Sequence, residues 1–167
     1  MTIGKLFLAL AFIGLMPYQT IFAASNEISR LIKSFSEQVG KDDGLSYTTS
    51  LELGRDKIKE INLFYSAKSS LHVDEARALI LKITNRFVRD VNNNAYLKGD
   101  LATYPFTADK LDITVFFRGK DGKYAKSPNV AQVSMHKGVV TFYKFTQGSF
   151  QIIHQENFQK SSKITKV

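Results

Sequence analysis

Two hydrophobic periods alternate along this 167-residue chain, and they limit the folds open to it. Two segments repeat apolar residues at the spacing of one helical face. The first follows Ser25 or Asn26, either of which can cap a helix, and Gly40 is expected to end it. The second is expected to begin after Ser69 or Ser70 and to end at the asparagines 92–94. The apolar stripes consist of Ile28, Leu31, Ile32, Phe35 and Val39, and of Ala76, Ile80, Ile83, Phe87 and Val91.

The other segments have the composition or the two-residue period of β-strands. The clearest runs from Leu111 to Phe117, where Leu111, Ile113, Val115 and Phe117 fall on one side. Turn residues rich in glycine separate the segments, and Gly119 to Gly122 is typical of a hairpin. Strands are therefore expected at 45–53, 57–66, 111–117, 129–135, 139–146 and 150–158.

The order of these elements predicts an α+β fold. Two amphipathic helices need an apolar surface to pack on, and a sheet with one apolar face supplies it. We therefore expect an antiparallel β-sheet, a meander in the C-terminal half, packed on one face by the two helices. Residues 25–158 are expected to form this single domain, and 159–167 a basic, flexible tail.

The first two dozen residues have the features of an export signal. Lys5 gives a positively charged start, and residues 6–16 form an unbroken apolar run that Pro17 ends. Small residues follow, so cleavage is expected after Ala23 or Ala24, which makes 1–24 a signal peptide. An uncleaved membrane anchor is the alternative, although the run is short for a span of about 20 residues. We expect a protein that is periplasmic or secreted onward, and the sequence leaves both destinations open.

A set of short motifs resembles small uncharacterised exported proteins of intracellular Gram-negative bacteria, over roughly residues 55–158. The motifs are Glu75-Ala76-Arg77 at the start of a long helix that ends near an asparagine, Leu101, Tyr104-Pro105-Phe106, the alternating strand Leu111 to Phe117, a glycine-centred hairpin, and Gly138 before an aromatic strand. The resemblance implies a bacterial envelope or secreted setting and carries over no activity.

The absence of cysteine excludes several kinds of chemistry. Disulfides, thiol catalysis, zinc-thiolate sites and iron–sulfur clusters all need cysteine, and there is none. No cofactor and no metal site are expected. The formal net charge of +8 instead favours anionic partners such as phospholipid head groups, lipopolysaccharide or acidic glycans. Nucleic acid is not expected as a partner, because the chain carries an export signal and no recognisable binding motif.

Candidate catalytic groups are few. The three histidines, His72, His136 and His154, are far apart in sequence and are most simply surface or turn residues. A two-histidine metal site with a carboxylate such as Glu156 is a lesser alternative. Acid/base catalysis would need Asp112 or Glu156 beside His136 or His154. No catalytic residue is assigned.

Basic and aromatic residues provide the better candidates for binding. One basic group is the helical stripe Lys82, Arg86 and Arg89, and the other surrounds the hairpin. Strand alternation places Phe116 opposite Phe117, and Phe142 opposite Tyr143 and Phe145, so one aromatic set must lie away from the main core. That set forms either a second layer or an exposed binding patch. The predicted binding residues are Arg118, Lys120, Lys123, Lys126, Lys144, Phe116 and Tyr143.

These observations favour a small exported binding protein that engages an anionic envelope component or a protein, with no stable membrane span after cleavage. The alternative is a small cofactor-free hydrolase or lyase that uses a histidine and carboxylate pair. The sequence does not decide the oligomeric state.

Overall fold

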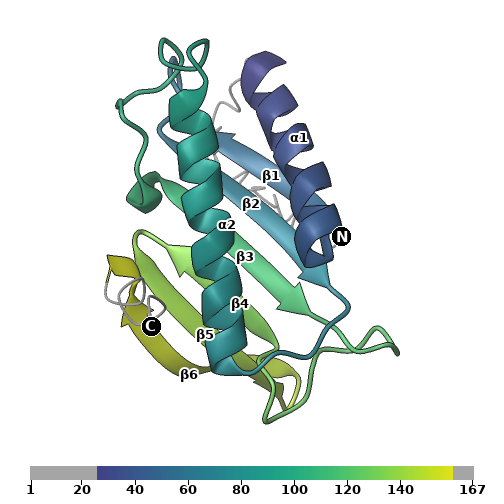
Figure 1. The fold of residues 1–167 in the computed structure, drawn as a ribbon. Helices are drawn as coiled ribbons and strands as arrows, with labels where there is room; N and C mark the ends of the chain where they lie inside the picture. The colour runs from purple at the N-terminus through teal and green to yellow at the C-terminus, as the bar shows by residue number, and fades with distance from the viewer. Residues whose placement is uncertain (1–25, 160–167) are drawn as a thin grey trace, which may run out of the picture.

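The computed structural model describes residues 26–159, which form two helices and a six-stranded sheet (Figure 1). The proposed signal peptide lies outside the described residues, as does the tail from residue 160. The helices are α1 (Asn26–Asp43) and α2 (Val73–Asn93), and a short 3₁₀ turn, η1 (Ala108–Lys110), precedes the third strand. The strands are β1 (Leu45–Leu53), β2 (Glu60–Ala67), β3 (Leu111–Phe117), β4 (Gln132–His136), β5 (Val139–Thr146) and β6 (Ser149–Asn157).

The sheet has the strand order β1-β2-β3-β4-β5-β6. Both helices pack on one of its faces, α1 against β1 and α2 against β3 and β4, and they run in opposite directions (Figure 1). The predicted α+β fold, with helices on one face and a C-terminal meander, is confirmed. One strand pair differs from the expectation, because β2 and β3 are parallel while the other four pairs are antiparallel. The helix α2 carries the chain back across the sheet, so β3 starts at the same end as β2.

Both predicted helical stripes are buried against the sheet and each other. Phe35 of α1 and Phe87 of α2 are buried and meet edge to face, with ring centroids 5.0 Å apart. The Tyr65 hydroxyl lies 3.0 Å from the Ser36 Oγ, which ties β2 to α1. In β3 the alternation predicted from sequence is present, since Leu111, Ile113, Val115 and Phe117 are all fully buried.

The ends of the helices differ from the predicted ones. The first helix runs through Gly40 to Asp43, and Gly44 follows it with a φ of 67°. A glycine inside a helix costs only about 1 kcal/mol, whereas the left-handed residue after a helix strongly favours glycine. The second helix is capped at His72 and not at Ser69 or Ser70, with the Glu75 carboxylate accepting a hydrogen bond of 2.8 Å from the His72 N–H. It ends at Asn93, within the expected asparagines, and the following Asn94 is extended.

Three strands also have shifted bounds. The second begins at Glu60 and not at 57, because residues 57–59 belong to the turn that Gly54 opens. The fourth covers Gln132–His136, and the segment before it belongs to the loop after β3. The last covers Ser149–Asn157 and so lies one residue earlier than expected.

Candidate functional site

The face of the sheet that lies opposite the helices, called here the open face, carries the candidate site residues. No described helix covers it. Side chains alternate along each strand, so the residues between the buried ones of β2, β3 and β4 point to this face and are half-buried or exposed. One end of the open face holds an aromatic cluster beside a basic hairpin, and the other end holds a carboxylate and histidine cluster.

The aromatic cluster confirms the predicted split between the two faces. Phe117 and Phe142 are fully buried under the helices. The rings on the open face contact one another at centroid distances of 4.7–6.4 Å. They belong to Phe116, Tyr124, Tyr143, Phe145 and Phe150. The cluster is half-buried because Tyr124, from the loop after β3, packs over it, so these rings form a small second layer.

The basic hairpin, residues 118–126, extends directly from this cluster. The Arg118 guanidinium lies 4.3 Å from the centroid of the Tyr124 ring and donates to the Gly122 carbonyl at 2.9 Å and to the Tyr124 hydroxyl at 3.2 Å. The hairpin contains four basic residues and one acidic residue, a net charge of +3. Its three lysines are exposed, and none has an ion pair within residues 26–159. They are Lys120, Lys123 and Lys126.

Lys144, which was predicted with this group, and Lys137 lie elsewhere. Lys144 follows Tyr143 and precedes Phe145 on β5, so it points to the helix-side face, away from the aromatic cluster. The structure therefore does not bring Lys144 together with the hairpin residues. Lys137 lies at the β4–β5 turn, at the opposite end of the sheet, where its backbone N–H donates to the Asp112 carboxylate at 3.3 Å.

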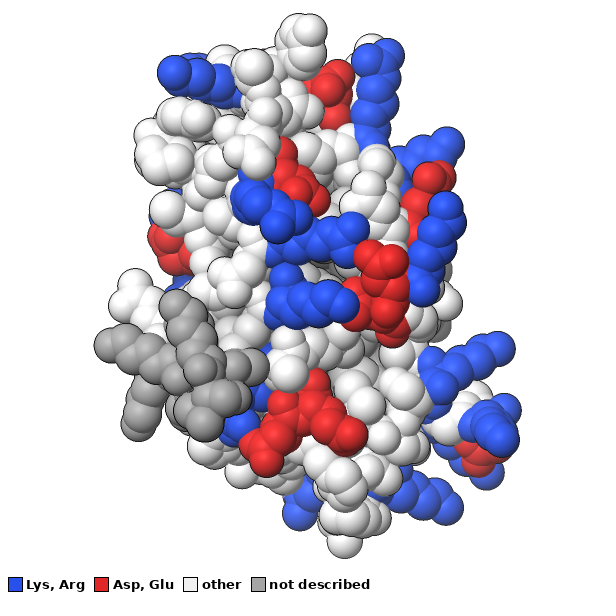
Figure 2. Space-filling model, in the orientation of Figure 1, with Lys and Arg blue, Asp and Glu red and all other residues white. Residues whose placement is uncertain are grey.

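The helical stripe serves to hold the two helices together. Lys82 pairs with Asp43 at 2.6 Å, and Arg86 pairs with Asp42 at 2.7 Å and donates to the Gln38 side chain at 2.6 Å. Figure 2 shows these basic side chains of α2 meeting acidic ones at the end of α1, while Lys and Arg also gather on the hairpin at the lower right. The Arg86 hydrogen bond holds the pKa of Asp42 below its usual range. Lys82 and Arg86 are therefore neutralised by α1, whereas the hairpin lysines have no such partners.

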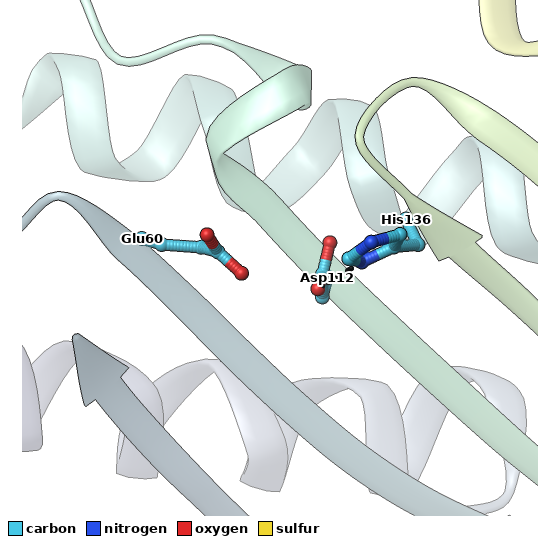
Figure 3. A group of neighbouring side chains, drawn as sticks. All are labelled: Glu60, Asp112 and His136. Carbon is cyan, nitrogen blue, oxygen red and sulfur yellow. Dashed lines mark hydrogen bonds and ion pairs between the residues drawn. The ribbon is translucent and has the colours of Figure 1, made fainter. Parts of the chain in front are cut away.

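The carboxylate and histidine cluster consists of Glu60, Asp112 and His136 (Figure 3). Asp112 Oδ2 and His136 Nδ1 are hydrogen-bonded to each other. Glu60 lies on the neighbouring strand, with its carboxyl group turned toward Asp112 (Figure 3). Partial burial, and then the charge and hydrogen bond of Asp112, raise the pKa of Glu60. The predicted Asp112 and His136 pairing is thus present, and Glu60 is a member that sequence reasoning missed.

The second histidine and carboxylate pair lies on the other face of the sheet. His154 Nε2 is 3.2 Å from Glu156 Oε2, and the His154 ring stacks near the buried Phe142 under α2. The Arg77 Nε donates to Glu156 Oε1 at 2.6 Å, which raises the pKa of Arg77. Because His136 and His154 lie on opposite faces, the two-histidine metal site considered from the sequence does not form.

Comparisons with protein-family models, with curated proteins and with solved structures found no match. Within residues 26–159, neither helix has the length and apolar character needed to cross a membrane.

Proposed function

We propose that this chain is an exported binding protein of the bacterial envelope or extracellular space, and that its basic hairpin binds phosphate groups on the lipid surface. The observation that carries the proposal is the hairpin charge of +3, borne by lysines without ion pairs and held against a packed aromatic cluster. The export signal expected at residues 1–24 would place the domain beside membrane surfaces rich in phosphate.

The chemistry of the hairpin suits phosphate. Lysine acts as a flexible point charge toward phosphate oxygens, and clustered lysines gain about 1 kcal/mol each near an anionic lipid surface. Arg118 is not expected to bind phosphate directly, because its guanidinium already contacts Tyr124 and the Gly122 carbonyl. It fixes the base of the hairpin, so Phe116 and Tyr143 contribute as part of the support and not as direct ligand contacts.

A second candidate function is acid/base catalysis by a small hydrolase or lyase, and the Asp112 and His136 pair favours it. Catalysis of this kind is most effective in a site that excludes water. The His136 side chain is 59% exposed and lies on the open face, so binding is the better supported function.

The binding proposal is tested by sedimentation with vesicles of phosphatidylcholine, with and without phosphatidylglycerol. We expect binding only to the anionic vesicles and weaker binding at high salt, because exposed charges are screened. The triple variant Lys120→Gln, Lys123→Gln, Lys126→Gln should weaken binding about 100-fold, from about 1 kcal/mol for each lysine.

The matched control replaces three exposed lysines elsewhere, Lys33, Lys57 and Lys59, by glutamine. It removes the same net charge from other surfaces, so it should retain most of the affinity. Competition with soluble glycerol phosphate distinguishes a site for a single phosphate group from one that needs a lipid surface. Equal losses in both triple variants would show that only net charge matters and would contradict the proposal.

A further inference from the structure

Three side chains on neighbouring strands of the open face converge with the geometry of a metal site. Glu60 comes from β2, Asp112 from β3 and His136 from β4. Each offers one ligand atom, and these atoms all lie within 4.8 Å of one another. Two ligands that each lie about 2.0–2.2 Å from one ion are at most about 4.4 Å apart, so small side-chain rotations would bring all three atoms onto a single ion. Figure 3 shows the Glu60 and Asp112 carboxyl groups turned toward each other and the His136 ring beside Asp112.

The sheet fixes these positions. Asp112 and His136 come directly next to the Ile113–Met135 pair of the antiparallel β3–β4 register. Asp112 lies opposite Asn62 in the parallel β2–β3 register, with Glu60 two residues before Asn62 on the same face. The three donors therefore come from the paired strands of a rigid sheet, which holds a site more accurately than loops do.

A second observation at the same place concerns Asn62. Its Oδ1 atom is buried and has no hydrogen-bond partner within the described part of the chain. Buried polar atoms are nearly always paired with protein, water or an ion. Asn62 pairs with Asp112 in the parallel β2–β3 register, which places this amide oxygen on the same face as a candidate fourth ligand.

We propose that Glu60, Asp112 and His136 bind a divalent transition-metal ion of the zinc class, with Asn62 as an additional oxygen ligand. The imidazole favours zinc over magnesium or calcium, which take mainly oxygen ligands. The positive charge of the ion would offset the repulsion of two adjacent carboxylates. This inference rests on the carboxylate and histidine cluster and does not depend on lipid binding by the hairpin.

The His154 and Glu156 pair provides an internal control with the same residue types. Glu156 is already bound by Arg77, whose positive charge opposes a cation there. The two pairs lie on opposite faces of one sheet, so a metal ion should select the His136 pair and leave the His154 pair unoccupied.

The test is calorimetric titration of the protein, purified without a histidine tag, with zinc chloride. We expect one ion per chain in the micromolar range, at least about tenfold weaker binding in His136→Gln and in Glu60→Gln, and unchanged binding in His154→Gln. Magnesium chloride should not compete. In NMR spectra the imidazole signals of His136, but not of His154, should shift on addition of zinc.

Backbone amide spectra of each variant verify that the fold is retained. The His136 and His154 side chains are 59% and 46% exposed, so their replacement should not unfold the sheet. Unchanged zinc affinity in His136→Gln would overturn the proposal. An equal loss in His136→Gln and His154→Gln would do the same, since it would assign the binding to surface histidines in general.

Discussion

The buried contact between Tyr65 and Ser36 predicts an unusual pH dependence of stability. Burial raises the pKa of Tyr65 from 10.0 to about 12, and the hydrogen bond with Ser36 opposes part of that rise. The folded protein therefore holds the phenolic proton more tightly than the unfolded chain. The resulting stability is fully present below pH 10 and is lost as the pH rises toward 12, by about 3 kcal/mol in total at 1.36 kcal/mol per pKa unit.

Replacing Tyr65 by phenylalanine should destabilise the protein at neutral pH but stabilise it relative to wild type at strongly alkaline pH. At neutral pH the variant loses the hydrogen bond to the buried Ser36, which costs about 1 kcal/mol. Above pH 10 only the wild-type protein has a buried phenol to ionise, so its advantage shrinks and the two stability curves should cross at about pH 10.5–11. The other tyrosines and the lysines titrate in both proteins and cancel in the difference.

Urea unfolding followed by far-ultraviolet circular dichroism, at a series of pH values, measures the two curves. The control is Tyr96→Phe, whose side chain is 82% exposed, and it should follow the wild-type protein throughout. Curves for Tyr65→Phe and wild type that stay parallel through the alkaline range would refute the reasoning. They would show that the folded and unfolded states bind the phenolic proton of Tyr65 equally tightly.

Further changes test the core, a turn, the hairpin support and the carboxylate cluster. Phe87→Ala should lower the free energy of unfolding by about 3–5 kcal/mol, since it removes a buried ring. Gly54→Ala should lower it by about 1–3 kcal/mol, because an added Cβ would lie 1.8 Å from a backbone oxygen. Tyr124→Ala should leave the core intact but loosen the hairpin, seen as faster amide exchange there and weaker vesicle binding. In chelator-treated protein, Glu60→Gln should raise stability at neutral pH by at most about 1 kcal/mol by removing repulsion with Asp112. That gain should disappear as acid protonates Glu60, whose pKa is raised.

The spacing of the apolar residues was sufficient to predict that two helices pack on one face of a sheet. The stripe from Ile28 to Val39 and the alternation from Leu111 to Phe117 both follow directly from burial, and both are present. Helix ends were harder to predict, because several residues near each end can cap a helix or stop it. Gly40 was expected to end the first helix, whereas the helix continues to Asp43 and Gly44 takes the left-handed conformation.

Strand pairing was the decisive information that the sequence lacked. The Asp112 and His136 pair lies within the meander, where consecutive strands are antiparallel neighbours, so it was open to prediction. Glu60 reaches the same cluster only because β2 and β3 are parallel neighbours across the α2 connection. A pairing of this kind joins segments about 50 residues apart and leaves no local signal.

Runs of basic residues in the sequence also do not show which tertiary contacts each residue makes. Lys82 and Arg86 form as clear a basic group as the hairpin lysines, yet Asp43 and Asp42 neutralise them across the helix interface. The acids at the C-terminal end of α1 oppose the helix dipole, and these ion pairs offset that cost. Which basic group remains available for a partner therefore depends on tertiary contacts.

The two ends of the open face are close enough to act on one partner but far enough apart to be tested separately. Asp112 and Phe116 lie four residues apart on β3, which places their Cα atoms about 13 Å apart at about 3.3 Å per residue. Changes at sites more than about 7–10 Å apart usually add. The lysine triple variant should therefore keep its zinc affinity, and His136→Gln should keep its vesicle affinity. If His136→Gln instead weakened vesicle binding only when zinc is present, the metal ion itself would be contacting the lipid phosphates, and the open face would be one continuous site.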